Sequence, residues 1–393
     1  MSMRAVLNGS PDSLDGPSVD AALSRIAAAA DVLDRHPAFP HDAFAELARA
    51  GILGATLPGP GPGAGKVRFA EELRLVREVS RADGSVGRIL DGHYNAVERL
   101  TVACPDALED GERARIAAGE LLLGVWGADP APGEGEPARL REEDGGLTLH
   151  GVKTFCSGAG GVQRALVVAR DEAGERRLAY VDVTEGVSID RSWYRGEGLR
   201  ASESHRVVFA GAPVPLVLGG PGEASREPWF SRDAIRTSAT WAGIADSVFA
   251  AALSYLGERG GPTDIVALAA GRMAVARGTI DRWLEHAAPR ADAAARADTR
   301  ADTAAHAAAA ARPDAPEHGE PLAVTAIEAR WAIAAAAREL AAEAALASGS
   351  RPLATGGALS RGRRDLDLFL LQHRLEPLLA RYGAAMISEG EGR

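Results

Sequence analysis

The sequence predicts an α+β protein in which a helical region, a small β region and a second helical region follow one another. Apolar residues recur at helical spacing before residue 121, short β-prone runs follow, and helical spacing then returns. The predicted domains are residues 1–121, 122–226 and 227–393. At 393 residues the chain exceeds a usual single hydrophobic core, so several packed units are expected.

The N-terminal region is predicted to contain several helices. Ala22, Ile26 and Leu33 share one face of the first of these. Pro40 fits the first turn of the next helix, and Gly51 can close it in a left-handed conformation. Further helices are predicted over 67–81 and 86–100, with a loop rich in Gly and Pro over 59–65.

The middle region contains short runs of β-prone residues separated by Gly, Asp and Glu. These runs cover 147–149, 164–168, 178–183 and 207–209. Their spacing is typical of a small antiparallel sheet or barrel, and not of a doubly wound parallel sheet.

The C-terminal region is predicted to be a helical bundle. The predicted helices cover 231–257, 263–288, 322–348 and 364–387. Residues 289–320 are biased toward Ala, Arg and Asp, so they either extend a helix or are disordered. We expect them to form a surface connector.

Composition and charge exclude several classes of function. The net charge of -10 argues against general binding to nucleic acid or to an anionic membrane surface. No apolar run reaches the ~18 residues needed to span a bilayer, and the N-terminus lacks signal-peptide features, which predicts a cytoplasmic protein. Cys104 and Cys156 lie far apart without a neighbouring His or Cys cluster, so neither a disulfide framework nor a metal site is expected.

Several motifs, in this order, resemble the acyl-CoA dehydrogenase superfamily of flavoproteins over nearly the whole chain. They are residues 36–54, Asp83–Val86 with His93 following, Gly151–Gly158, Gly198–Ser204 and Arg361–Asp365. The resemblance implies an N-terminal helical domain, a middle antiparallel β domain or barrel, and a C-terminal helical bundle. It also implies a bound flavin, FAD or FMN, and a homodimer or homotetramer.

The resemblance assigns flavin contacts to five residues. A flavin ring needs an apolar wall and hydrogen bonds at its edge. Phe155 is expected to pack on the ring and Ser157 to donate to its edge. Both side chains should lie on the same face of the strand, because strand side chains alternate and these residues are two positions apart. Trp126 and Ala128 occupy a family loop at the pyrimidine edge, where Ala128 replaces a Thr and leaves only main-chain contact. Arg259 corresponds to an Arg that reaches the FAD diphosphate. The neighbouring Phe-Gly is absent, so FMN is an alternative and Arg259 is otherwise a solvated helix-end cation.

The Glu that removes the α-proton in most of the family is missing from its usual place. Counting nine residues back from Asp365 reaches Gly356, and no Asp or Glu occurs from residue 348 to 364. Some members carry the base on the first helix of the bundle, where Asp233 aligns. Asp233 is therefore a candidate base, although an Asp early in a helix also acts as a cap or dipole partner.

A branch of the superfamily that uses reduced flavin and oxygen also lacks this Glu. The resemblance is nearer to this monooxygenase branch, whose strand Ser and two His correspond to Ser157, His93 and His373. A His can donate or accept a proton near neutral pH. Each has an equally good structural explanation: His93 as a capped, half-buried helix residue, and His373 as a core histidine whose hydrogen bonds are satisfied.

The predicted function is thus flavin-dependent oxidoreduction, with monooxygenase or oxidase chemistry through a flavin–oxygen adduct favoured. The alternatives are an acyl-CoA dehydrogenase that uses Asp233, and a catalytically silent homologue. The expected partners are a small-molecule substrate, such as an acyl thioester or an aromatic, and a separate flavin reductase.

Overall fold

The computed structural model describes most of the chain, with interruptions. The described residues are 14, 16–58, 66–108, 110–143, 145–258, 263–307, 321–372 and 374–390. Outside them lie the predicted loop over 59–65, Arg259, His373 and residues 308–320 of the biased tract.

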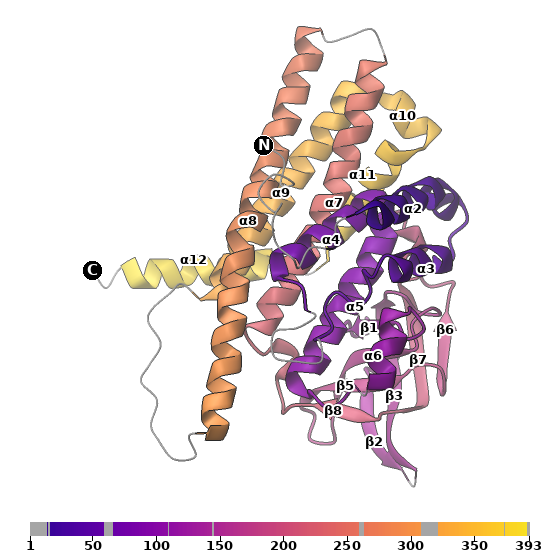
Figure 1. Cartoon of the computed structure of the whole chain (residues 1–393), viewed down its shortest axis with the longest axis vertical. Coiled ribbons are helices and arrows are strands. Elements are labelled where there is room, and N and C mark those ends of the chain that lie inside the picture. Colours follow the sequence, from indigo (N-terminus) through magenta and orange to yellow (C-terminus); the bar gives the residue numbers. More distant parts are fainter. Residues whose placement is uncertain are drawn as a thin grey trace.

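The predicted N-terminal helices are confirmed. They are α2 (Pro17–Arg35), α3 (His41–Arg49), α4 (Phe69–Ala82) and α5 (Gly84–Ala103); a further short helix, α6 (Asp110–Ala117), was not predicted. The Asp83 carboxylate starts α5 by accepting hydrogen bonds from the amides of Ser85 (2.7 Å) and Val86 (3.1 Å), as an N-cap residue does. Helix α5 is buried along most of its length and contacts both strand β1 and helix α7, so it joins the sheet to the bundle (Figure 1).

The middle region forms one sheet with the strand order β6-β7-β3-β2-β4-β5-β8, and β1 pairs with β4. The strands are β1 (Leu123–Trp126), β2 (Arg139–Glu143), β3 (Gly146–Cys156), β4 (Arg164–Arg170), β5 (Arg176–Asp182), β6 (Val187–Asp190), β7 (His205–Pro213) and β8 (Leu216–Leu218). Most pairings are antiparallel, as predicted, but β4 runs parallel to both β1 and β2. The sheet is mixed because the β2–β3 hairpin lies between β1 and β4 in sequence and lets them run in the same direction.

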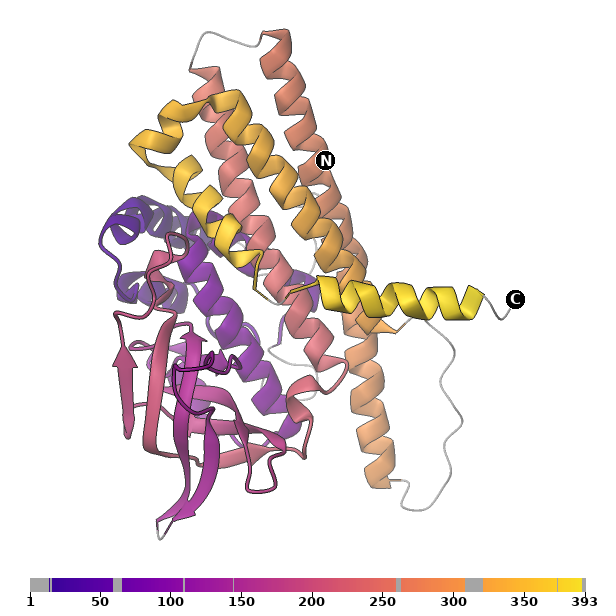
Figure 2. The same ribbon diagram turned by 180° about the vertical axis from the view of Figure 1, so that it is seen from behind.

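The C-terminal helices form an upright bundle beside the sheet (Figures 1 and 2). They are α7 (Trp229–Gly257), α8 (Asp264–Ala307), α9 (Leu322–Ser348), α10 (Ser350–Thr355), α11 (Ala358–Phe369) and α12 (Glu376–Gly390). Helix α8 continues into the biased tract as far as Ala307 with Pro289 inside it. Although α8 is long, no helix among the described residues is both long and apolar enough to cross a bilayer.

One helix prediction is wrong. A single helix was expected over 364–387, but the chain forms α11 and α12 with a break between Phe369 and Glu376. Pro377 explains the break, because proline is tolerated in the first turn of a helix and disrupts a helix interior. Helix α12 contacts α9 at its start and then projects away from the bundle (Figure 2).

A buried network of charges joins α4, α5 and α7. Glu98 accepts hydrogen bonds from Arg232 and Arg236, each at 2.8 Å, and also from Lys66. Glu72 accepts from Arg236 at 2.6 Å. Burial opposes ionisation of Glu98, but Arg232, Lys66 and Arg236 together hold its pKa well below its usual range. The network therefore fixes these three helices against one another with compensated charges.

Removing the charge of Glu98 tests this network. We expect Glu98→Gln to lower the free energy of unfolding by ~3–5 kcal/mol, because the buried guanidinium groups lose their shared carboxylate. Asp367→Asn is the control, since exposed Asp367 pairs with Arg363 at 3.8 Å and such pairs contribute ~0–1 kcal/mol. Urea unfolding measures both changes. Equal effects in the two variants would contradict a structural role for the network.

Candidate functional site

The end of β3 presents an exposed aromatic side chain. Phe155 is 53% exposed and its backbone is left-handed (φ 51°). Its ring meets Trp193 edge-to-face with ring centroids 4.8 Å apart. The pairing of β3 with β7 shifts register between Lys153 and Cys156, and Ser157 lies in the turn beyond the strand. The bulge and the turn therefore set the relative directions of Phe155 and Ser157, and simple strand alternation does not.

Three serine hydroxyls form a chain at this turn. The Oγ atoms of Ser157 and Ser204 lie 2.9 Å apart, and those of Ser204 and Ser202 lie 2.7 Å apart. Ser202 and Ser204 are buried, whereas Ser157 is half-buried. The backbone supports the chain, because the amide of Gly158 donates to the carbonyl of Ser202 (2.7 Å). Of the three, only the Ser157 hydroxyl is open to a ligand; it is hydrogen-bonded to buried Ser204, which is in turn hydrogen-bonded to buried Ser202.

Backbone strain gathers around these hydroxyls. Among the described residues, the non-glycine residues with positive φ are Phe155 (51°), Leu199 (49°) and Glu203 (48°). Such conformations cost about 1–3 kcal/mol each and persist where the surrounding structure imposes them, often at functional sites. All three lie in the two segments that carry Ser157, Ser202 and Ser204, so the strain marks this turn as the candidate site.

Helix α11 anchors the strained segment. The Asp365 Oδ1 atom accepts a hydrogen bond from the Leu199 amide at 2.6 Å. Gly198 allows this approach, because a Cβ atom at that position would lie 2.2 Å from the Arg364 carbonyl oxygen. Burial, and then the neighbouring Asp83, raise the pKa of Asp365 to about 7. Arg364 also binds Asp34 with a 2.5 Å contact, so α11 links α2 to the site.

The segment after β1 lies beside the site. The Trp126 ring is buried and donates from Nε1 to the Ser157 carbonyl at 3.0 Å, so the ring supports the turn and presents no surface to a ligand. Ala128 is exposed, and its carbonyl accepts from the Thr154 amide at 3.1 Å. Buried Lys153 binds Asp129 at 2.6 Å and fixes the segment against β3. The predicted main-chain role of Ala128 remains a prediction.

His93 lies in the core between α5 and β1. Its Nδ1 atom accepts from the Leu123 amide at 3.1 Å, and its Nε2 atom lies 3.3 Å from the Leu53 carbonyl oxygen. Nδ1 is therefore unprotonated, and Nε2 carries the proton and donates. Burial lowers the pKa of His93 to about 4, so the ring is neutral near pH 7. His93 is thus fully buried, and not the half-buried helix residue that was its structural alternative; its catalytic role remains a prediction.

Asp233 is paired on both carboxylate oxygens. Its Oδ2 atom accepts from Arg99 at 3.0 Å and its Oδ1 atom from Arg236 at 3.4 Å. Burial raises the pKa of Asp233 to about 6, against the opposing effects of these two arginines. Arg99 in turn donates to the backbone carbonyl of Ala224 at 2.9 Å. Asp233 thus helps to hold the start of α7, and its role as a base remains a prediction.

Gly356 occupies the position at which the usual Glu was sought. It follows α10 in a left-handed conformation (φ 84°), and a Cβ atom there would meet no atom within 4 Å. Space alone would thus admit a side chain, but the backbone conformation disfavours one. His373 and Arg259 cannot be placed relative to this loop, since both lie outside the described residues.

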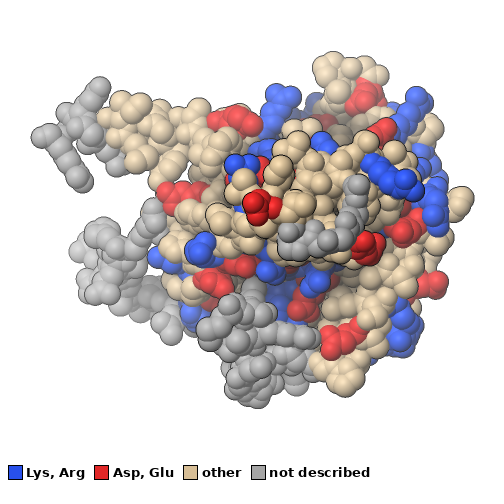
Figure 3. All heavy atoms as spheres, turned by 90° about the horizontal axis from the view of Figure 1, so that it is seen from above, with Lys and Arg blue, Asp and Glu red and all other residues tan. Residues whose placement is uncertain are grey.

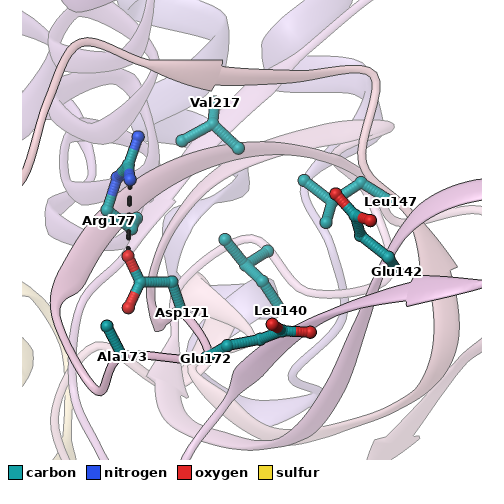
Figure 4. A pocket seen from close by; sticks show the side chains of 8 residues that line it. All are labelled: Leu140, Glu142, Leu147, Asp171, Glu172, Ala173, Arg177 and Val217. Carbon is teal, nitrogen blue, oxygen red and sulfur yellow. Dashed lines mark hydrogen bonds and ion pairs between the residues drawn. The ribbon is translucent and has the colours of Figure 1, made fainter.

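A shallow hollow of about 400 Å³ lies elsewhere on the sheet (Figure 4). Leu140, Leu147 and Val217 line it, and Asp171 pairs with Arg177 at its edge at 3.3 Å. Leu147 and Ser157 are ten residues apart along and just beyond β3, a separation of up to ~33 Å in an extended strand. The hollow lacks the strained backbone and the hydroxyl chain, so we do not assign the function to it.

The fold is confirmed by comparison with known proteins. Residues 19–108 match the family model of the acyl-CoA dehydrogenase N-terminal domain. FMN-bound TdsC, a dibenzothiophene monooxygenase from Paenibacillus sp. A11-2, superimposes with a TM-score of 0.77 at 18% identity, covering 95% of this chain and 98% of TdsC. The chain carries an acyl-CoA dehydrogenase N-terminal domain and has the acyl-CoA dehydrogenase-like fold.

Two curated relatives are more similar in sequence. The amino sugar nitrososynthase RubN8 of Streptomyces rubradiris is 34% identical over 50% of this chain and 48% of its own length. The L-evernosamine nitrososynthase of Micromonospora sp. is 30% identical over 61% of this chain and 60% of its own length. The chain thus spans about half to three fifths of these relatives.

Sequence reasoning missed the residues that support Ser157. Ser202 and Ser204 lie in a motif that was noticed for its resemblance, but nothing in its spacing showed that the side chains reach Ser157. Lys153 and Asp365 were also noticed only as motif members. A buried Lys with an Asp partner would have required knowledge of the strand pairing.

The pH dependence of stability tests the structural role of His93. The pKa of about 4 in the folded protein lies below the ordinary value of 6.5, so the unfolded chain binds a proton first as the pH falls. We expect the free energy of unfolding to lose ~3 kcal/mol between pH 6.5 and pH 4 through this residue. His93→Gln should remove that part of the slope, and His36→Gln, at an exposed position, should not. An unchanged slope in His93→Gln would refute the assignment.

Asp365 is tested by two substitutions measured at pH 8. Asp365→Ala removes the acceptor of the buried Leu199 amide, and we expect a loss of ~1–3 kcal/mol in the free energy of unfolding. Asp365→Asn keeps an acceptor oxygen and removes a buried charge, so it should be at least as stable as the wild type. If Asp365→Asn is as destabilised as Asp365→Ala, the charge and not the hydrogen bond holds the segment.

Proposed function

We propose that this protein is a flavin-dependent monooxygenase that uses reduced FMN and oxygen to oxidise a small molecule. The observation that carries the proposal is the loop at Gly356, where the fold's usual proton-abstracting Glu is replaced by a glycine in a left-handed conformation. Dehydrogenation of a thioester needs a carboxylate at its α-carbon. Asp233, the remaining candidate, already accepts from Arg99 and Arg236.

The residues at the end of β3 fit a flavin. A flavin ring presents a flat apolar face and polar atoms at its edge. Phe155 offers an exposed aromatic surface that is braced by Trp193, although large aromatic side chains are usually mostly buried. Ser157 offers a hydroxyl at the same turn, supported from behind by Ser204. The exposed backbone at Gly127 and Ala128 completes the predicted edge contacts.

FMN is the form that we propose. The similar solved structure of TdsC is FMN-bound, and the motif that would hold the FAD diphosphate is altered around Arg259. The distribution of charge on the protein surface does not argue against FMN. On the face seen in Figure 3, acidic and basic side chains are interspersed.

The substrate class that we propose is a small molecule with an oxidisable amino nitrogen. RubN8 and the L-evernosamine enzyme are named as nitrososynthases of amino sugars. Reduced FMN, when bound, supplies two electrons to oxygen; one oxygen atom enters the substrate and the other leaves as water. A separate reductase must then supply reduced FMN. The chain's own part is to bind the ring at Phe155, to position Ser157 at its edge, and to keep the site free of a competing carboxylate base.

Flavin binding tests the proposal at its first step. We expect the purified full chain to bind FMN, and Phe155→Ala to weaken binding about tenfold through the loss of aromatic contact. Quenching of FMN fluorescence measures both dissociation constants. Trp331→Ala, at another exposed aromatic residue on α9, is the control and should bind FMN like the wild type.

Two reactions then separate the candidate activities. Anaerobic mixing of the FMN-loaded protein with acyl-CoA should leave the flavin spectrum unchanged, whereas bleaching would favour a dehydrogenase that uses Asp233. Reduced FMN, oxygen and an amino sugar should yield a product that gains one oxygen atom from labelled oxygen. A protein that binds neither FMN nor FAD would support the silent homologue.

A further inference from the structure

Arg330 on α9 is a buried cation without a charge partner. It is 6% exposed, and it forms no hydrogen bond or ion pair with any residue that the structure describes. Every other buried arginine in the described part of the chain pairs with an Asp or Glu; these are Arg74, Arg77, Arg88, Arg99, Arg232, Arg236 and Arg361. An unpaired buried charge costs free energy, so Arg330 is the exception that requires a reason.

Aromatic rings surround the Arg330 guanidinium. Its Cζ atom lies over the ring of buried Trp241, 4.9 Å from the ring centroid. Trp241 meets Phe369 edge-to-face with centroids 6.1 Å apart, and Arg88 lies over the Phe369 ring at 5.5 Å. Attraction to the face of a ring needs no hydrogen-bond acceptor, so these contacts hold Arg330 while its N–H groups stay available.

Asp91, the carboxylate on α5 that attracts Arg330 from a distance, is already engaged. Its Oδ2 atom accepts from Arg88 at 2.7 Å and from Thr237 at 3.1 Å, and its Oδ1 atom accepts from Asn95 at 3.3 Å. Burial lowers the pKa of Arg330 to about 10 against the opposing effect of Asp91, so the guanidinium is charged near pH 7. With Asp91 bound to Arg88, the positive charge of Arg330 remains for a ligand.

The free atoms of Arg330 match a carboxylate. Nε and Nη2 both lack an acceptor, and their N–H groups lie side by side on one edge of the guanidinium. Two parallel N–H···O bonds from such an edge fit the two oxygens of a carboxylate. One negative charge would also balance the one unpaired positive charge, whereas a phosphate dianion would leave an excess of negative charge.

We propose that Arg330 binds the carboxylate of the substrate, so that the substrate is an amine that also carries a carboxylate. This inference rests on the proposed function, which supplies the oxidisable amino nitrogen. Phe369 follows Asp365 by one turn of α11, about 6 Å. Asp365 anchors the Leu199 segment of the candidate site, so the rings that hold Arg330 adjoin the helix that holds the site.

The experiment measures ligand binding to the full chain without flavin, by calorimetric titration and thermal unfolding. The probes are a panel of α-amino acids and their carboxamides, because the members of each pair differ only in the group that Arg330 would bind. Arg330→Met removes the guanidinium and keeps a long unbranched side chain. Arg330→Lys keeps the charge and loses the two-donor edge. Arg272→Met is the control, at an exposed arginine on α8 that pairs with Glu343.

We expect at least one amino acid to bind more tightly than its carboxamide, and Arg330→Met to weaken that binding at least ~30-fold, as truncation of a buried charge partner does. Arg330→Lys should bind more weakly than the wild type, and Arg272→Met should bind equally well. Without ligand, Arg330→Met should unfold at a temperature no lower than the wild type, because it no longer buries an unpaired cation. A merely structural Arg330 would lower that temperature and leave the carboxylate preference unchanged.

Three results would overturn the inference: no amino acid binds, amino acids and carboxamides bind equally, or Arg330→Met keeps the wild-type affinity. FMN and riboflavin are titrated in parallel, and weaker binding of FMN alone in Arg330→Met would assign Arg330 to the flavin phosphate and also overturn it. If Arg330→Met does not fold, Arg330→Lys decides. Carboxylate binding that depends on Arg330 in a chain that binds no flavin would keep this binding site and overturn the proposed function.

Discussion

The hydrogen bond from the Leu199 amide to Asp365 is the constraint on which the candidate site depends. It joins the last part of the helical bundle to a β-domain segment that is 166 residues away in sequence. Leu199 and Glu203 hold left-handed backbone conformations on either side of Ser202. Such conformations need an external restraint. The buried acceptor on α11, together with the close approach that Gly198 allows, supplies that restraint.

The helical core provides the platform for this arrangement. Helix α5 lies between the sheet and the bundle, and its charged face meets the arginines of α7 through Glu98. Its opposite face meets β1 through His93, whose ring binds main-chain groups on both sides. Polar groups thus fix α5 on two faces. A small movement of α5 would leave the buried polar groups of Glu98 and His93 without their partners, which costs free energy. These contacts therefore fix the sheet, and with it the end of β3, relative to the bundle.

Much of the fold could be predicted, because the information is local. Helical periodicity placed α4, α5, α7 and α9, and the predicted β runs correspond to β3, β4, β5 and β7, whereas the shorter strands β1, β2, β6 and β8 were not predicted. The parallel pairing of β1 with β4 and the break at Pro377 were missed, since the first depends on strand order and the second on one residue. At the site, Phe155 and Ser157 were found through the family resemblance. The bulge that orients them, and the partnership of Ser157 with Ser204 at a separation of 47 residues, depend on how β3 pairs with β7.

The absence of the Glu is interpreted together with the geometry around Ser157. Gly356 alone would be consistent with an inactive protein, but strain at Phe155, Leu199 and Glu203 is retained around a supported hydroxyl. A crystal structure of the full chain with FMN would test the central claim most directly. We predict the flavin ring against Phe155, with the Ser157 Oγ atom within ~3 Å of N5. FMN bound away from the end of β3, or a ring whose N5 edge faces away from Ser157, would contradict it.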